Sequence, residues 1–130
     1  MAVRIVRLGS PRAPDEGLRI GTVRHPPRGV RKEDFGRLDW YDVWYPNLAP
    51  TADAVRAAHP LQTDADWARF VRQYRATMKT PDHARSIALL AALSHQASFS
   101  VGCYCENEAR CHQSILRDLL REAGARLGDN

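Results

Sequence analysis

The sequence predicts an α/β fold, in which strands and helices alternate within one domain. Three observations support this prediction. Short apolar runs at 3–8 and 18–24 are typical of strands. Helical spacing of apolar residues follows in the middle of the chain, and a strand–loop–helix unit ends it. We therefore expect residues 1–130 to form a single compact domain, with a small, mostly parallel sheet flanked by helices.

An irregular segment is predicted after the first two strands. The strands are separated by the turn-forming sequence SPRAPDEG, and prolines exclude a continuous helix from residues 25–50. This segment contains Trp40 and Trp44, two of the three tryptophans, so we expect it to pack on the rest of the domain. Its aromatic part, WYDVWY at 40–45, is also a candidate homodimer contact, because Trp and Tyr anchor many interfaces.

Three helices are predicted between the irregular segment and the last strand. The first begins at Thr51 and ends before Pro60, the second covers 63–79 with a capping box to Asp66, and the third covers 80–95 with a proline in its first turn. The positions expected to face the core are Trp67, Phe70, Val71 and Tyr74 in the second helix and Ile87, Leu90, Ala91 and Leu93 in the third.

The C-terminal part holds all three cysteines within nine residues, followed directly by His112. Residues 98–105 are predicted as a strand, with Cys103 and Cys105 on one face, and a helix is expected from Cys111 to about Arg121. Its apolar side is Ile115, Leu116, Leu119 and Leu120.

The N-terminus lacks the apolar segment of a signal peptide, and no apolar run is long enough to span a bilayer. We therefore expect a cytoplasmic protein with no membrane partner, in which thiols stay reduced. In that environment a cysteine cluster indicates catalysis or metal binding before disulfides.

A thiol-based site is the first interpretation of this cluster. Ligands of open α/β sheets bind beyond the carboxyl ends of the strands, where a helix N-terminus attracts anions. Cys105 would then be a nucleophile or redox thiol, with its pKa lowered, His112 the acid/base and Arg110 a cation that stabilises negative charge. The residues leave open whether the protein is an enzyme at all.

Metal binding and core packing are the competing interpretations. Cys103, Cys105, Cys111 and His112 could together hold zinc or iron. Against this, Cys111 and His112 are neighbours on the predicted helix, about 100° apart, so both should not reach one ion easily. Cys103 lies in an apolar strand and is expected to be a small core residue. We therefore predict no cofactor, with the metal as the alternative.

Three motifs in the same order carry a family resemblance. The segment CYCENEARCHQSILRDLL resembles the C-terminal signature of DUF488, a bacterial family of unknown function, including its YeaO-like branch. VRHPPRGVRKE and WYDVWYPNLAPT resemble its two upstream elements. The resemblance implies a compact α/β domain but no activity. Gln113 stands where the family usually has arginine, and Pro26 where the YeaO-like branch tends to have tryptophan.

The upstream element adds basic residues to the candidate site. Arg24, Arg28 and Lys32 follow a strand, so we expect Arg24 and Arg28 to face the cysteine loop across one cleft that holds a small anionic or nucleotide-type ligand, with Gln113 and Ser114 as further contacts. Alternatively, Arg28 pairs with Glu33 or Asp39 and only fixes the irregular segment.

The net charge of +4 comes mostly from dispersed arginines, and no known nucleic-acid-binding motif is present, so nucleic acid is not expected as a partner. The alternative function is a metal-binding or protein-interaction module without catalysis.

Overall fold

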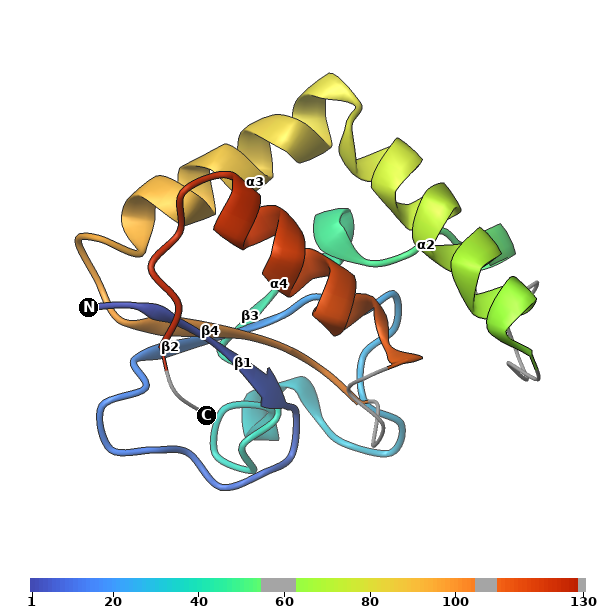
Figure 1. Cartoon of the computed structure of the whole chain (residues 1–130). Coiled ribbons are helices and arrows are strands. Elements are labelled where there is room, and N and C mark those ends of the chain that lie inside the picture. The colour runs from blue at the N-terminus through green and yellow to red at the C-terminus, as the bar shows by residue number, and fades with distance from the viewer. Residues whose placement is uncertain (55–62, 105–109, 129–130) are drawn as a thin grey trace.

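The protein is built around a four-stranded, all-parallel sheet with the order β1-β4-β2-β3. The computed structural model describes residues 1–54, 63–104 and 110–128. The predicted α/β class is confirmed (Figure 1). The strands are β1 (Val3–Arg7), β2 (Leu18–Gly21), β3 (Val43–Trp44) and β4 (Phe99–Cys103).

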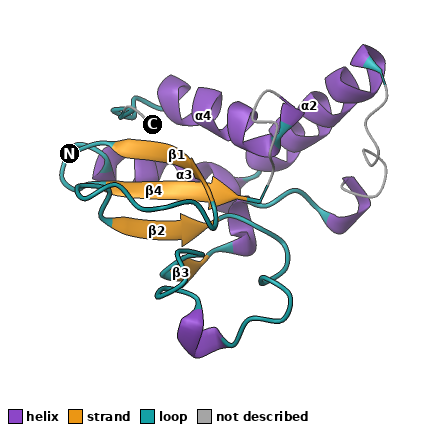
Figure 2. Cartoon of the chain, turned by 90° about the horizontal axis from the view of Figure 1, so that it is seen from below, coloured by secondary structure: helices purple, strands orange, loops and turns teal. Residues whose placement is uncertain are grey.

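Three long helices lie together on one face of the sheet, and irregular loops cover the other face (Figures 1 and 2). The sequence predicted helices flanking the sheet, whereas the described long helices all cover the same face. None of the described helices is long and apolar enough to cross a membrane. The helices are α2 (Asp64–Met78), α3 (Pro81–Leu93) and α4 (His112–Glu122), with the 3-10 turns η1 (Lys32–Asp34) and η2 (Pro46–Leu48).

The starts predicted for the first three helices are confirmed where the structure describes them. Thr63 caps α2 by accepting a hydrogen bond from Asp66 N over 3.0 Å. Ala54 N donates to Thr51 Oγ1 over 3.1 Å at the start of the first predicted helix, of which 52–54 are described and the rest lies outside the described residues. α3 begins at Pro81, whose fixed φ suits the first helical position.

The main core lies between the sheet and the helices. Ile5 and Ile20 both pair with Val101 of the central strand, so the three side chains form one row on the helix face. Phe70, Tyr74, Ile87, Leu90, Ile115, Leu116 and Leu120 pack against this face as predicted. Trp67 and Val71 are only partly buried at its edge, and Leu93 is 39% exposed, so its predicted core position is wrong.

Two strand predictions needed correction. β2 ends at Gly21 and not at residue 24, and a β-carbon at Gly21 would lie 2.4 Å from the Tyr41 ring. The missed strand, β3, contains only two residues and pairs with Ile20 and Gly21. Such a short edge strand inside a proline-containing segment has no alternation that a sequence pattern could reveal.

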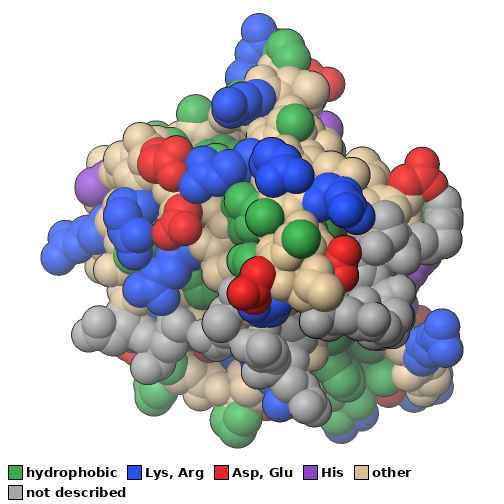
Figure 3. Space-filling model, turned by 45° about the vertical axis from the view of Figure 1, so that its right-hand side comes forward, with side chains coloured by type: hydrophobic (Ala, Val, Ile, Leu, Met, Phe, Trp, Pro, Cys, Tyr) green, Lys and Arg blue, Asp and Glu red, His purple; other side chains and the backbone are tan. Residues whose placement is uncertain are grey.

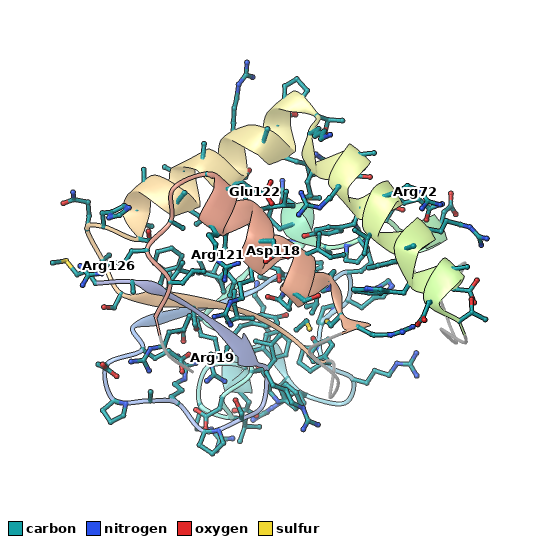
Figure 4. The ribbon with its side chains drawn as sticks, viewed as in Figure 1. Arg19, Arg72, Asp118, Arg121, Glu122 and Arg126 are labelled. Atoms are coloured by element: carbon teal, nitrogen blue, oxygen red, sulfur yellow. The ribbon has the colours of Figure 1, made fainter. Side chains whose placement is uncertain are left out.

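A fully buried ion pair lies on the loop face of the sheet, where Figure 4 shows Arg19 on the side opposite the helices. Arg19 Nε and Nη2 donate to the two carboxylate oxygens of Glu16 over 2.7 and 2.9 Å. Arg19 Nη1 donates to the carbonyls of Ser10 and Asp39, and Ser100 Oγ donates to Glu16. The pair therefore connects two loops to the central strand.

A second, more exposed network reinforces the same loops. Arg12 binds the carboxylate of Asp42 through two hydrogen bonds of 2.7 and 3.0 Å and also contacts Asp39 over 3.2 Å. Asp42 accepts a further hydrogen bond from the backbone of Arg19. Asp39 has a φ of 63°, a left-handed conformation that Asp tolerates better than most residues. Residues 8–17 and 36–42 are thus held as one layer.

The charged state of Glu16 is stabilised in the fold. Burial by itself would raise its pKa, but hydrogen bonds from Arg19 and Ser100 and the charge of Arg19 lower the pKa from 4.5 to about 2. Because the folded state binds the proton more weakly, this contribution to stability is complete above pH 4.5 and is lost as the pH falls towards 2.

We expect Glu16→Gln to lower the free energy of unfolding at neutral pH by about 3–5 kcal/mol, because it leaves the Arg19 cation buried without its anion. Urea unfolding followed by circular dichroism measures this loss. The variant should also lose less stability than the wild type between pH 4.5 and 2. Glu33→Gln, at an exposed position, is the matched control and should change neither quantity. Equal acid sensitivity of Glu16→Gln and the wild type would contradict the assignment.

Candidate functional site

A cavity of about 600 Å³ opens at the carboxyl ends of β1, β2 and β4. The three strands are parallel and in register there, with Arg7 opposite Cys103 and Gly21 opposite Gly102. The cavity therefore occupies the usual place for ligands in open α/β sheets. Its lining consists of Arg7, Leu8, Val23, Arg24, His25, Pro26, Pro27, Arg28, Trp40, Pro50, Cys103, Tyr104 and His112.

Arg24, Arg28 and His112 line this cavity together, whereas Arg110, which was also predicted in the cleft, does not. Arg24 Nε and Nη2 donate to the carbonyl of Pro50 over 3.1 and 2.9 Å, so this arginine also holds the wall of the cavity in place. Arg28 is exposed and makes no ion pair with Glu33 or Asp39 in the described part of the chain. The carboxylate of Asp39 binds Arg12 instead.

Two aromatic rings form another wall. The Trp40 and Tyr104 ring centroids are 5.8 Å apart with an interplanar angle of 73°, an edge-to-face contact. Tyr104 Oη donates to the carbonyl of His25 over 2.9 Å and so joins β4 to the loop that follows β2. Burial raises the pKa of Tyr104, with the neighbouring Tyr41 and Cys103 adding to the shift, so the hydroxyl remains a donor at neutral pH.

A sulfur–imidazole cluster lies where β4 ends and α4 begins. Cys103 Sγ is 2.8 Å from Cys111 Sγ, and Cys111 Sγ is 3.8 Å from His112 Nδ1. The three ligand atoms all lie within 4.8 Å of one another. The residues are 4%, 3% and 7% exposed, and Cys103 and His112 reach the cavity wall. Such a compact group of soft donors can hold a metal ion.

The hydrogen bonds of His112 decide which ring nitrogen carries a proton. Nε2 lies 2.8 Å from the carbonyl oxygen of Thr22, which can only accept, so Nε2 is the donor. In the neutral ring Nδ1 then presents its lone pair on the side of Cys111. Tyr74 packs beside the imidazole, with ring centroids 5.7 Å apart, and holds the ring in place.

Cys111 is not a helical residue, which corrects the argument that it and His112 point apart. It is the N-cap of α4, with φ −126° and ψ 152°, and the helix begins at His112. The 100° separation of helical neighbours therefore does not apply to this pair. The extended backbone of Cys111 turns its side chain toward Cys103, and Ser114 Oγ donates to the Cys111 carbonyl over 2.8 Å.

The other predicted site residues are placed differently. Gln113 is buried behind His112, donates to Thr22 Oγ1 and is not part of the cavity lining. Its Oε1 has no hydrogen-bond partner in the described part of the chain. Lys32 is exposed in η1 and lines a separate hollow with Phe35 and Trp44. Ser114 lies in the first turn of α4, where its hydroxyl donates to the Cys111 carbonyl, and it does not line the cavity.

Arg110 does not line the described cavity. Arg110 forms an ion pair with Asp64 and donates to the carbonyl of Thr63 over 3.2 Å, so it connects the start of α4 to the start of α2. Cys105, the predicted nucleophile and a member of the alternative metal set, lies outside the described residues.

Sequence reasoning did not assign the lining residues Arg7, Trp40 and Tyr104 to the site. The signal for Arg7 was present, because it is the last residue of a strand whose carboxyl end faces the cysteine segment. A signal for Tyr104 was also present, because this residue directly follows Cys103 at the end of β4. Trp40 had no such signal, since only the tertiary packing of 36–42 brings it to this edge.

The sequence model of the active DUF488-N3 subclade matches residues 3–124. The chain belongs to this subclade. Across 121 residues it is 26% identical to the uncharacterized protein YeaO of Escherichia coli strain K12, covering 93% of this chain and 98% of that protein. No solved structure matches the chain. The DUF488 resemblance of the three motifs is thus confirmed.

The described surface of this DUF488-N3 protein carries charges of both signs. Figure 3 shows basic and acidic side chains interspersed on the face that it presents. On α4, Arg121 forms an ion pair with Asp118 over 3.1 Å (Figure 4). Val43 and Trp44 of the aromatic segment are 40% and 44% exposed, while the Trp44 indole donates to the Val23 carbonyl. The homodimer contact stays a prediction.

We expect Cys103 and Cys111 to react with a small alkylating reagent at least about tenfold more slowly in the folded protein than in urea, because both are nearly enclosed. Peptide-resolved mass spectrometry measures each cysteine separately. A chelator in both samples ensures that slow labelling reports burial and not a bound metal. Equal rates in the folded and unfolded protein would contradict the packing described here.

Proposed function

We propose that the cavity binds an anionic ligand with a planar group, of the nucleotide type. The observation that carries this proposal is the joint lining of one cavity by Arg7, Arg24 and Arg28 together with the Trp40 and Tyr104 rings. Positive charge and aromatic surface therefore meet at the carboxyl edge of the sheet, where such ligands commonly bind.

The anionic part of the ligand is assigned to the arginines. A guanidinium offers donors in a planar fork that matches phosphate and carboxylate oxygens. Arg28 is exposed at the cavity rim and makes no hydrogen bond or ion pair with the described residues, so its donors can turn to a ligand without breaking a contact. Arg24 already holds the Pro50 carbonyl and keeps the wall in place beside Arg28.

The planar part of the ligand is assigned to Trp40 and Tyr104. Stacking of a base on an aromatic side chain contributes about 1–3 kcal/mol. The cavity volume of about 600 Å³ lies within the range of small-molecule sites. Because Cys103 and Cys111 are nearly enclosed, the proposal assigns no described thiol as nucleophile.

Binding of adenosine monophosphate (AMP), adenosine and inorganic phosphate, measured by isothermal titration calorimetry, tests the proposal. We expect AMP to bind more tightly than either part alone. Arg28→Gln should weaken AMP binding by about tenfold or more, because it removes a charge-assisted hydrogen bond, and should leave adenosine binding unchanged.

Arg31→Gln is the matched control. Arg31 lies three residues further along the chain, is exposed and does not line the cavity. It should bind AMP as the wild type does. Equal losses in Arg28→Gln and Arg31→Gln would show that only general surface charge attracts the anion. No binding of AMP or of the guanosine, cytidine and uridine monophosphates at millimolar concentration would overturn the proposal.

A further inference from the structure

We propose that Cys103, Cys111 and His112, the ligands that the described residues supply, hold one zinc ion with a further coordination position on the side of the cavity. The site is formed by residues from two elements, the end of β4 and the start of α4, and by the extended backbone of Cys111 between them. It does not depend on which ligand enters the cavity, so it extends beyond the proposed function.

The donor set fits zinc. Two thiolates and one imidazole are ligands that zinc prefers, and the three donor atoms already lie within 4.8 Å of one another. Zn–S bonds of about 2.3 Å at tetrahedral angles separate two sulfurs by about 3.8 Å. The sulfurs of Cys103 and Cys111 are 2.8 Å apart, so metal binding requires them to move apart by about 1 Å. We expect a side-chain rotation of Cys111 at the helix cap to provide this movement.

The hydrogen bonds around His112 resemble those that usually surround a metal-binding histidine. Ligating histidines usually donate their other ring N–H to a carbonyl or carboxylate, which fixes the ring and its tautomer. Here Nε2 donates to the Thr22 carbonyl over 2.8 Å, and Nδ1 is the nitrogen on the side of Cys111. Thr22 is itself fixed, because its hydroxyl donates to the Gly102 carbonyl of β4.

The negative charge of two thiolates favours a bound cation at this buried position. The sulfurs pack among Leu8, Val23 and Tyr41, an apolar setting in which a single unpaired charge is costly. A zinc ion with two thiolates and a neutral imidazole has no net charge. Zinc binding therefore allows both cysteines to be deprotonated without leaving an uncompensated negative charge in this apolar setting.

The remaining coordination position would place a Lewis acid next to the ligand cavity. Zinc sites with three protein ligands keep a fourth position for water or substrate, and the metal there acts as a Lewis acid. Cys103 and His112 line the cavity that contains the arginines, so an oxygen of an anionic ligand could reach the ion. The metal would thus sit at one end of the cavity and Arg28 at its rim.

Metal analysis of the purified full-length protein tests the site. We expect one equivalent of zinc, and replacement by cobalt should give the visible bands of a tetrahedral ion with thiolate-to-cobalt charge transfer. Cys111→Ser and His112→Gln should each lower zinc affinity at least about tenfold. His83→Gln, at a histidine outside the cluster, should retain the full equivalent. Because the cobalt spectrum is recorded on the wild type, the test does not depend on the variants' folding.

Addition of inorganic phosphate or azide to the cobalt protein tests the open position, since a small anion that binds the ion shifts the visible bands. Bands that do not respond would overturn the open position. Metal-free protein that gains no metal on incubation with zinc, or a Cys103–Cys111 disulfide in its place, would overturn the site itself. Calorimetry of the zinc-free protein with AMP distinguishes the two proposals, because the arginine and aromatic contacts remain when the metal is removed.

Discussion

The ion pair between Arg19 and Glu16 is the constraint on which the loop face of this protein depends. A buried ion pair contributes little net stability by itself, because the desolvation of both charges offsets their attraction. Its effect here is positional. Arg19 also donates to carbonyls of two loops, at Ser10 and Asp39, and Glu16 accepts from Ser100 on the central strand. If these loops were placed elsewhere, buried N–H groups of Arg19 would lose their carbonyl acceptors.

The cavity follows from this arrangement of loops. Leu8 and Trp40 each lie one or two residues from the carbonyls that Arg19 holds, and both line the cavity. Gly102 allows the close approach of β1 to β4, since a β-carbon there would lie 2.7 Å from the Leu8 side chain. The loop contacts and the close strand packing thus bring the end of β4 beside the arginines that follow β2. A parallel sheet with helices on one face and fixed loops on the other has its opening at this edge.

Two kinds of chemistry meet in the cavity. At its rim, Arg28 is exposed and its charge is accessible to a ligand. At its inner end, Cys103 and His112 are nearly enclosed, with a defined tautomer at the imidazole. Under the two proposals, the charge near solvent would recognise an anion at low desolvation cost, and the enclosed donors would hold a metal ion beside it. The division of roles follows from burial and not from residue type.

The sequence by itself determined the fold class, the main strands and the helix starts, because these depend on local signals: apolar periodicity, the Thr63 cap and Pro81. It also indicated Arg24, Arg28 and His112, through the rule that parallel strands end at one edge. It could not locate Trp40, whose ring partner Tyr104 is distant in the sequence, or the Arg19–Glu16 pair, whose members are close in the sequence but meet through irregular backbone before β2. Only the tertiary structure decided that Cys111 is a cap residue facing Cys103, because a cap leaves the helical period that sequence reasoning assumes.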